Sequence, residues 1–387
     1  MIHTDAWVLH AGPKDVGTQD RPPGILHRAS HSFTAPGERE ALVEPLYGSW
    51  EANIEHALSR RPIDVCHLRD EETVVLGNLG IVRVLGAGPS SSLGEGQICM
   101  VMPFAKRDPY GYAELIYAYD APRTVGLLAR RTKMAADLLL PLPDDSRFSL
   151  PQWAAYARYF TAWDNWQVAH RCWSAQMRDE DPGGHLVFGW GGGVVLAELL
   201  LAKRAGFRVA MTAGSDGRLA ELTGLGITAV DRRLFPHLAH DPEHPPTDPA
   251  EVARYRTSEK EFLKTVDALS DGAGAAIFVD NIGAPLYKAT IKALARQGVV
   301  TTVGWKEGMR TFHLRASECI NRHLHVNTHV WRYADCATIR DFQEDTGWIP
   351  SVDPAGIYEF DEVGQLAADY SAGKIDSYFP LYRVNPT

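Results

Sequence analysis

Four glycines close together in the middle of the chain, Gly189-Trp190-Gly191-Gly192-Gly193, are its clearest candidate for chemistry. The apolar run before them, 185–188, has the composition of a β-strand, and the longer run after them, 194–206, has that of a helix. A glycine turn between a strand and a helix lets the backbone approach a phosphate, and the helix N-terminus offers N–H groups and a positive dipole to the anion. We therefore predict a dinucleotide-binding turn of the Rossmann type, with a tight turn that binds no ligand as the alternative. The expected cofactor contacts are Gly189, Trp190, Gly191, Gly192, Gly193 and Val194.

Trp190 and Val195 stand near positions at which small residues usually admit the phosphates and the helix. Side chains of this size could narrow the site or change how the cofactor lies. They are also compatible with a scaffold that keeps the fold and has lost dinucleotide binding.

The next expected strand, 207–213, ends without the acidic residue that NAD-preferring sites use to bind the ribose hydroxyls. Asp216 lies two residues later than such a carboxylate is expected. Ser215 and Arg218 could instead bind the additional phosphate of NADPH, because a guanidinium suits a phosphate group. NADPH is therefore the predicted cofactor. In the alternative, Asp216 is a helix N-cap and Arg218 is a solvated helix residue.

Strands and helices alternate through the middle of the chain, and such alternation predicts a parallel, doubly wound sheet. Three of the expected helices end at a glycine, namely Gly206, Gly226 and Gly298, as helices with a left-handed C-cap do. Two later strand ends, Asn281 and Gly304, would lie at the same sheet edge as the glycine turn. We expect both to contact the cofactor.

The first third of the chain contains short β-branched and aromatic runs separated by glycine and proline, which predicts a β-rich region. Around Pro151 the pattern changes, and tryptophan and tyrosine recur at helical spacing through 150–173. We interpret this aromatic stripe as the buried face of a helix. A short helix and a strand-like tail follow after about residue 340.

The 387 residues include 39 basic and 48 acidic side chains, for a net charge of −9. This balance argues against nucleic acid or an anionic membrane as a partner, because both require clustered positive charge. No run approaches the roughly 18 apolar residues of a membrane span, and the first residues lack the features of a signal peptide. The five cysteines are scattered, so we expect reduced thiols in a cytoplasmic enzyme.

Several segments together resemble the medium-chain dehydrogenase/reductase superfamily, and within it the zinc-independent crotonyl-CoA carboxylase/reductases and their enoyl reductase relatives. The segment PGEREALVEPLYGSW is similar to early strands of the family's GroES-like domain, and YGYAEL is similar to a later strand. Residues 185–206 align without gaps onto the family's cofactor turn, and the acidic insertion 241–266 is an unusually specific match, because the carboxylase/reductases have a similar Asp-Pro-containing stretch there. The resemblance covers most of residues 37–380.

This resemblance implies an α/β protein with two domains. Residues 1–150 and 341–387 would form a GroES-like β-rich catalytic domain, and 151–340 would form the Rossmann domain. It also implies a homodimer, because Rossmann edge strands in these proteins commonly pair across subunits. The zinc-dependent branch holds its metal with Cys, His and Glu. This chain has Gly48 near the cysteine position and Gly77-Asn78-Leu79 in place of Gly-His-Glu, so we expect no metal.

The carboxylating members of the family hold carbon dioxide with an Asn, a Phe-Glu pair and a His. His329 matches the histidine, whereas Glu51 falls near the asparagine position, with Asn53 close by, and Lys106 falls near the Phe-Glu pair. Most of that pocket is altered, so we expect no carboxylation. His329, Glu51 and Lys106 could instead form a different catalytic polar site. In the alternative, His329 is a hydrogen-bonded histidine at a strand end, and the two charged side chains are solvated.

Two groups of histidines lack the flanking cysteines or carboxylates of a known metal site, so we expect them to be structural or on the surface. They are His323, His325 and His329, and His237, His240 and His244.

The main hypothesis is an NADPH-dependent reductase of an activated C=C bond, such as that of an enoyl thioester or another α,β-unsaturated carbonyl. In the zinc-free branch, hydride chemistry relies on positioning NADPH against a polarised thioester. The rival hypothesis is a repurposed scaffold, with an altered or lost dinucleotide site, that catalyses a non-redox reaction or binds a small molecule. A carboxylating reductase with a rebuilt pocket is a third hypothesis.

Overall fold

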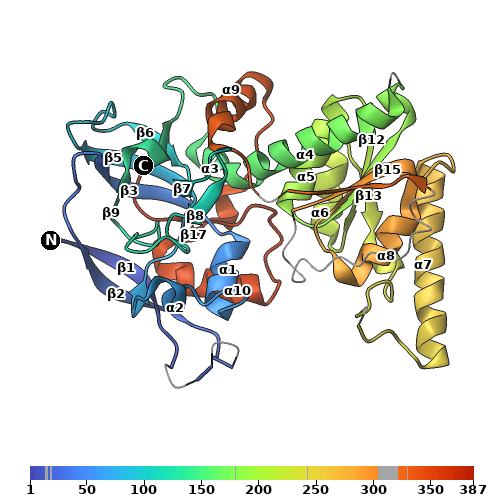
Figure 1. The fold of residues 1–387 in the computed structure, drawn as a ribbon, viewed down its shortest axis with the longest axis horizontal. Coiled ribbons are helices and arrows are strands. Elements are labelled where there is room, and N and C mark those ends of the chain that lie inside the picture. Colours follow the sequence, from blue (N-terminus) through green and yellow to red (C-terminus); the bar gives the residue numbers. More distant parts are fainter. Residues whose placement is uncertain (14–15, 18–19, 179, 242, 304–320, 329) are drawn as a thin grey trace. The chain divides into compact units, whose positions relative to one another are not determined.

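The computed structural model describes residues 1–387 except 14–15, 18–19, 179, 242, 304–320 and 329. The chain forms two compact units, shown in Figure 1. The first unit combines Met1–Ala157 with Arg332–Thr387, and the second is Arg158–Trp331. The expected domain limits at residues 150 and 340 lie near the limits of these units.

The first unit is β-rich. Its three-stranded sheet has the order β2-β1-β4, its seven-stranded sheet has the order β10-β6-β5-β3-β18-β17 with β9 paired to β3, and β7 and β8 form a separate pair. The strands are β1 (Ile2–His10), β2 (Leu26–Phe33), β3 (Glu40–Ser49), β4 (Thr73–Val74), β5 (Gly80–Ala87), β6 (Ile98–Val101), β7 (Phe104–Arg107), β8 (Ala113–Ile116), β9 (Thr132–Ala135), β10 (Leu139–Pro141), β17 (Tyr358–Glu359) and β18 (Leu381–Arg383). The helices are α1 (Ala52–Ser59), α2 (Val65–Arg69), η1 (Ala136–Leu138), α3 (Leu150–Ala154), η5 (Tyr333–Asp335), α9 (Cys336–Thr346), η6 (Pro354–Gly356), η7 (Phe360–Glu362) and α10 (Val363–Ser371).

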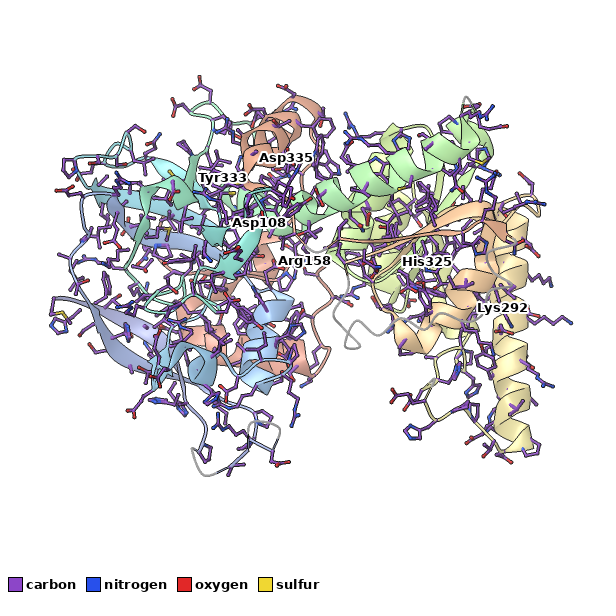
Figure 2. All side chains as sticks on the ribbon, in the orientation of Figure 1. Asp108, Arg158, Lys292, His325, Tyr333 and Asp335 are labelled. Atoms are coloured by element: carbon purple, nitrogen blue, oxygen red, sulfur yellow. The ribbon has the colours of Figure 1, made fainter. Side chains whose placement is uncertain are left out.

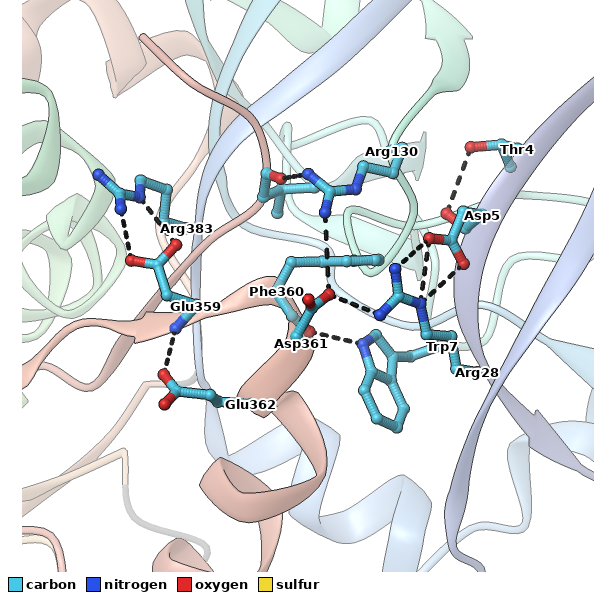
Figure 3. A network of polar contacts seen from close by, with 11 residues as sticks. Thr4, Asp5, Trp7, Arg28, Arg130, Glu359, Phe360, Asp361, Glu362 and Arg383 are labelled. Atoms are coloured by element: carbon cyan, nitrogen blue, oxygen red, sulfur yellow. Dashed lines mark hydrogen bonds and ion pairs between the residues drawn. The ribbon is translucent and has the colours of Figure 1, made fainter.

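Segments from both ends of the chain build this unit together. Strand β18 pairs antiparallel with β3, so that Tyr382 lies opposite Gly48. At another place, Figure 3 shows Phe360 held by two guanidinium groups, with Arg28 at 5.5 Å and Arg130 at 4.5 Å from the ring centre. The indole nitrogen of Trp7 donates a hydrogen bond of 2.8 Å to the Phe360 carbonyl oxygen. The C-terminal segment is therefore fixed to the N-terminal hairpin.

The second unit contains a six-stranded parallel sheet with the order β13-β12-β11-β14-β15-β16. This is the order of a doubly wound dinucleotide-binding domain, in which the strand sequence reverses beside the first strand. The expected α/β fold class is confirmed. The strands are β11 (Leu186–Trp190), β12 (Arg208–Ala213), β13 (Thr228–Asp231), β14 (Ala275–Asp280), β15 (Leu294–Thr302) and β16 (Leu324–Asn327). The helices are α4 (Tyr156–Met177), which begins at the end of the first unit, η2 (Pro182–Gly184), α5 (Gly193–Arg204), α6 (Asp216–Gly224), η3 (Arg232–Leu234), α7 (Pro249–Leu269) and α8 (Ala284–Ala293).

The aromatic stripe lies on helices, and most of its members are buried, including Trp153 on α3 and Trp166 and Trp173 on α4. Helix α4 has 22 residues and α7 has 21. Among the described residues, no helix is both long enough and apolar enough to cross a membrane.

Two of the three expected glycine C-caps are left-handed, with φ of +95° at Gly206 and +68° at Gly226. The expectation for Gly298 is wrong, because α8 ends at Ala293 and Leu294 already has an extended backbone. Gly298 lies within β15, where an added Cβ would be 2.8 Å from the Ala295 carbonyl oxygen. Close packing of backbone, and not a helix end, requires glycine there.

Candidate cofactor-binding site

The glycine turn joins the end of β11 to the start of α5. Gly191 has a φ of +146°, a conformation that favours glycine. Gly192 is the N-cap residue of α5, and the first hydrogen bond of the helix runs from the Leu196 N–H to the Gly192 carbonyl oxygen at 3.2 Å. The N–H groups between these two residues have no partner within the helix. Together with the helix dipole they form a surface that suits an anion.

Helix α5 packs closely against β11 because glycine leaves room for Val195. An added Cβ would lie 2.4 Å from a methyl carbon of Val195 at Gly189, and 2.7 Å from one at Gly191. At Gly192, by contrast, no described atom lies within 4 Å of an added Cβ. The turn is therefore closely packed on its inner side and open at Gly192.

The two bulky residues of the turn are both buried. Val195 is 0% exposed, and Trp190 is 3% exposed. The Trp190 ring lies in an aromatic cluster, with its centre 4.9 Å from that of Phe262 on α7 and 4.8 Å from that of Phe278 on β14. Each side chain packs into the core of the unit, so neither takes the open space beside Gly192.

Asn281 connects the strand ends around the turn. Its backbone N–H donates to the Trp190 carbonyl oxygen at 3.2 Å, and its Oδ1 accepts from the Val303 N–H at 3.0 Å. Asn281 thereby joins β11, β14 and the end of β15. Its expected contact with a cofactor stays a prediction. Gly304, the other expected strand-end contact, lies outside the described residues.

Beneath Asn281, the carboxylate of Asp280 shapes the same loop. It accepts hydrogen bonds from the N–H groups of Ile282 at 3.0 Å and Gly283 at 2.8 Å, and from the Thr290 hydroxyl at 2.6 Å. Burial raises the pKa of Asp280, and these donors oppose the shift. This group shapes the backbone and is not exposed to a ligand.

The end of β12 contains the residues expected to choose between the two cofactors. Ser215 is the N-cap of α6, and its hydroxyl accepts from the Arg218 N–H at 3.4 Å. Asp216, which the alternative interpretation placed at the N-cap, instead pairs with Arg233 at 2.6 Å. Arg233 also binds Asp231 at 2.8 Å, and the two carboxylates raise its pKa. The charge of Arg233 is thus already compensated.

Sequence reasoning missed Arg232, which directly follows β13. An added Cβ on Gly214 would lie 2.1 Å from Nε of Arg232 and 2.8 Å from its Cζ, so the guanidinium occupies the volume of a residue-214 side chain. Position 214 is where an NAD-preferring site would have its carboxylate. Among the residues that the structure describes, no hydrogen bond or ion pair engages the Arg232 side chain, which is exposed. In the sequence, the two consecutive arginines Arg232 and Arg233 after a strand could have indicated a phosphate-binding position.

The three residues expected to form a catalytic polar site are not brought together by the described contacts. Glu51 is the N-cap residue of α1, and one of its oxygens accepts from the Ser49 hydroxyl at 2.5 Å. Lys106 forms an ion pair with Glu114 on the neighbouring strand β8, and its side chain is 64% exposed. His329 lies outside the described residues.

Near Glu51, the ring of Tyr382 lies against Gly48, the position compared with the cysteine ligand, and against Gly77, the glycine before the positions compared with His and Glu. An added Cβ would lie 2.0 Å from Cζ of Tyr382 at Gly48, and 2.6 Å from its hydroxyl oxygen at Gly77. Tyr382 is fully buried, and its hydroxyl has no hydrogen-bond partner among the described residues. A cysteine at position 48 is therefore incompatible with Tyr382 in this place.

Three described histidines of the two groups contact aromatic or acidic side chains of the protein. His325, labelled in Figure 2, approaches the Tyr287 hydroxyl with its Nδ1 at 2.6 Å. His240 packs its ring against Tyr255 at 4.7 Å, and His244 pairs with Asp241 at 2.9 Å. Within the described part of the chain, no three His, Cys, Asp or Glu side chains are grouped so that they could hold a metal ion.

Comparison with known proteins finds similarity at the level of structure. No family model and no curated protein sequence matches the chain. Among solved structures, the crotonyl-CoA carboxylase/reductase AntE in complex with NADP has a TM-score of 0.78 at 17% identity, with 100% of this chain and 95% of that one covered. The 2-octenoyl-CoA carboxylase reductase CinF, in complex with NADP and 2-octenoyl-CoA, has a TM-score of 0.75 at 17% identity, with 98% and 87% covered.

An alcohol dehydrogenase is also similar in structure. The thermostable enzyme from Pyrobaculum aerophilum has a TM-score of 0.71 at 15% identity, with 99% of this chain and 100% of that one covered. The fold is that of the medium-chain dehydrogenase/reductases. The predicted resemblance to this superfamily, with crotonyl-CoA carboxylase/reductases among the neighbours, is confirmed at the level of fold. Within this fold the glycine turn lies between a strand and a helix, as the sequence predicted.

Proposed function

We propose that the protein is a zinc-independent, NADPH-dependent oxidoreductase that reduces an activated C=C bond, such as that of an enoyl thioester or another α,β-unsaturated carbonyl. One observation carries the choice of cofactor: the exposed guanidinium of Arg232 occupies the side-chain volume of Gly214, just after the end of β12. A carboxylate at this place would bind the ribose hydroxyls of NAD, whereas a guanidinium favours the additional phosphate of NADPH.

The residues of the second unit fit such a cofactor. The N–H groups at the start of α5 would bind the pyrophosphate beside Gly192, where the turn is open. Arg232, with Ser215 and Arg218, would bind the additional phosphate. Asn281 would hold the strand ends in register around the turn. When bound, NADPH supplies a hydride from its nicotinamide ring.

The type of substrate is supported by the structural neighbours. CinF was solved with both NADP and 2-octenoyl-CoA, which is an enoyl thioester. For this chain we propose reduction without carboxylation, because the positions compared with the carbon dioxide pocket hold Glu51 and Lys106. Lys106 is engaged by Glu114, so of these two we retain only Glu51 as a candidate polar group near the reaction. We also retain His329 as a candidate.

Independence from zinc is supported by Tyr382. Its ring takes the space beside Gly48 and Gly77, the positions compared with the metal-binding segments of the zinc-dependent branch. A homodimer and a cytoplasmic location are further proposals. The first is supported by the resemblance to the superfamily, and the second by the scattered cysteines.

The test compares two adjacent arginines. Arg232→Ala should weaken NADPH binding about 10- to 100-fold, because hydrogen bonds to charged groups contribute about 1.5–3 kcal/mol, and should leave NADH binding unchanged. Arg233→Ala is the matched control, since Arg233 is already paired with two carboxylates and should affect NADPH much less. Calorimetric titration gives the affinities, and NADPH oxidation with crotonyl-CoA, with and without bicarbonate, tests the reaction.

Equal losses in the two variants, or equal NADH and NADPH affinities in the unaltered protein, would refute the assignment of Arg232. Oxidation that depends on bicarbonate would favour a carboxylating reductase. If neither dinucleotide binds, the rival hypothesis of a repurposed scaffold gains support.

A further inference from the structure

A buried polar network crosses the second unit between helices α4 and α5 and the sheet. Its centre is Asn165 on α4, whose Oδ1 accepts from the hydroxyls of Thr301 at 2.5 Å and Thr328 at 2.9 Å. The amide nitrogen of Asn165 donates to Glu198 on α5 at 3.1 Å. Asn165, Glu198 and Thr301 are each 0% exposed. One amide side chain thus connects two helices with the ends of two strands.

The network lies close to the level of the glycine turn. Across the sheet, Gly189 on β11 pairs with Val279 on β14, and Val279 pairs with Thr301 on β15. Thr328 directly follows β16, and its N–H donates to the Thr302 carbonyl oxygen at 3.2 Å. Asn165 therefore binds the hydroxyl of Thr301, near the carboxyl end of β15, and the hydroxyl of Thr328, which follows β16.

The order of the strands separates the two halves of a dinucleotide. Strands β12 and β13, which end shortly before Ser215 and Arg232, lie on one side of β11, and strands β14, β15 and β16 lie on the other. A dinucleotide binds across the carboxyl ends of the strands at this switch point. If the adenosine phosphate meets Arg232, the nicotinamide half must lie over the ends of β14 to β16. These are the ends that Asn165 and Asn281 connect.

Burying such a polar network in a core has a desolvation cost that apolar side chains do not have. Burial of an amide and a carboxyl group requires hydrogen bonds to compensate for lost hydration, and one oxygen of Glu198 has no partner among the described residues. Leucine-type side chains would fill the same volume without this penalty. What the polar groups add is direction, because their hydrogen bonds fix the strand ends at defined distances and angles.

We propose that Asn165 is a positioning residue, which acts through Thr301 and Thr328 to fix the strand ends that hold the nicotinamide half of the cofactor. The proposal rests on the NADPH-dependent function proposed above. Hydride transfer requires the reacting atoms to approach within about 3–3.5 Å, and a misplacement of about 1 Å can reduce the rate about 100-fold. Asn165 itself is buried and would not touch the cofactor.

The experiment compares Thr301→Val, which removes the hydroxyl and keeps the shape of the side chain, with Thr301→Ser, which keeps the hydroxyl. Thr328→Val tests the second contact, in case one variant folds poorly. Affinities are measured for NADPH and for 2′,5′-ADP, which carries only the adenosine half with its additional phosphate. The fluorescence anisotropy of bound NADPH reports the mobility of the nicotinamide, and turnover is measured with crotonyl-CoA as the probe.

We expect Thr301→Val to bind 2′,5′-ADP as the unaltered protein does, and to hold a more mobile nicotinamide. We expect its kcat to fall about 10- to 100-fold, and Thr301→Ser to restore both properties. A purely structural role would instead lower the thermal stability and both affinities together. An unchanged anisotropy and kcat in both valine variants would overturn the proposal. If the unaltered protein binds 2′,5′-ADP but not NADPH, the proposal also fails, whereas binding of neither ligand refutes the proposed function itself and this inference with it.

Discussion

Replacing Glu198 by glutamine tests whether the Glu198 carboxyl group, in the buried network of the second unit, keeps its proton in the folded protein. Glu198 is 0% exposed and accepts a hydrogen bond from Asn165 at 3.1 Å. Burial raises the pKa of this carboxyl well above its ordinary value of 4.5, and the bond from Asn165 opposes the shift only in part. Glu198 should therefore be neutral in the folded protein at pH values where the unfolded chain has already lost the proton.

The sign of the effect on stability follows from proton linkage. Between 4.5 and the raised pKa of the folded state, the folded protein binds one proton more than the unfolded chain at this site. Its free energy of unfolding must then fall as the pH rises, by up to about 1.4 kcal/mol per pH unit from this group alone. Glutamine does not titrate, so Glu198→Gln should lose that slope. From about pH 5.5 to about pH 7.5, the stability of the variant relative to the unaltered protein should rise by up to about 2.7 kcal/mol.

Urea denaturation at three pH values in this range, followed by circular dichroism, gives the required free energies. The glutamine amide leaves N–H groups without acceptors, which costs about 1–3 kcal/mol at every pH, so the slope decides the test and not the absolute stability. Glu261→Gln, at an exposed position on α7, is the matched control and should leave the slope unchanged. Parallel profiles for Glu198→Gln and the unaltered protein would refute the reasoning, because Glu198 would then carry the same charge in both states.

Three further substitutions test the packing beside the glycine turn and the packing of Tyr382 against Gly48. Trp190→Ala should lower the free energy of unfolding by about 3–5 kcal/mol without tighter NADPH binding, because this ring fills the core; calorimetric titration that finds a gain in NADPH affinity would show that the ring obstructs the turn after all. Tyr382→Phe should leave stability unchanged or slightly increased in thermal denaturation, because it removes a buried hydroxyl without a described partner; a loss of 2 kcal/mol or more, by the same principle, would reveal a hidden partner. Gly48→Ala should destabilise the protein by about 1–3 kcal/mol, because its Cβ collides with the Tyr382 ring, and thermal stability equal to that of the unaltered protein would contradict the packing.

The sequence predicted the strand, the glycine turn and the helix well because all of their signals are local. A short apolar strand, the glycines at Gly189 and Gly191, and an apolar helix follow one another within a few residues, and each has a conformational meaning of its own. The N-cap of α6 was harder to choose, because Ser215 and Asp216 are adjacent and both are good capping residues. The structure selects Ser215, while Asp216 pairs with Arg233.

Other features depend on contacts between distant segments, which local patterns do not contain. Asn165 meets Thr301 across 136 positions of sequence, and nothing near Asn165 distinguishes it from other polar residues on a helix. The place of the Trp190 side chain could not be predicted from the sequence for a similar reason. Residue type gives the size of a side chain, but the side of the strand on which it lies depends on the packing of α7 and β14.

The central claim is that the open glycine turn and Arg232 together hold NADPH in preference to NADH. Calorimetric titration of the unaltered protein with both dinucleotides, in the same buffer, tests it most directly. We expect NADPH to bind about 10- to 100-fold more tightly than NADH, as hydrogen bonds between a guanidinium and the additional phosphate require. Equal affinities, tighter binding of NADH, or no binding of either dinucleotide would contradict the account.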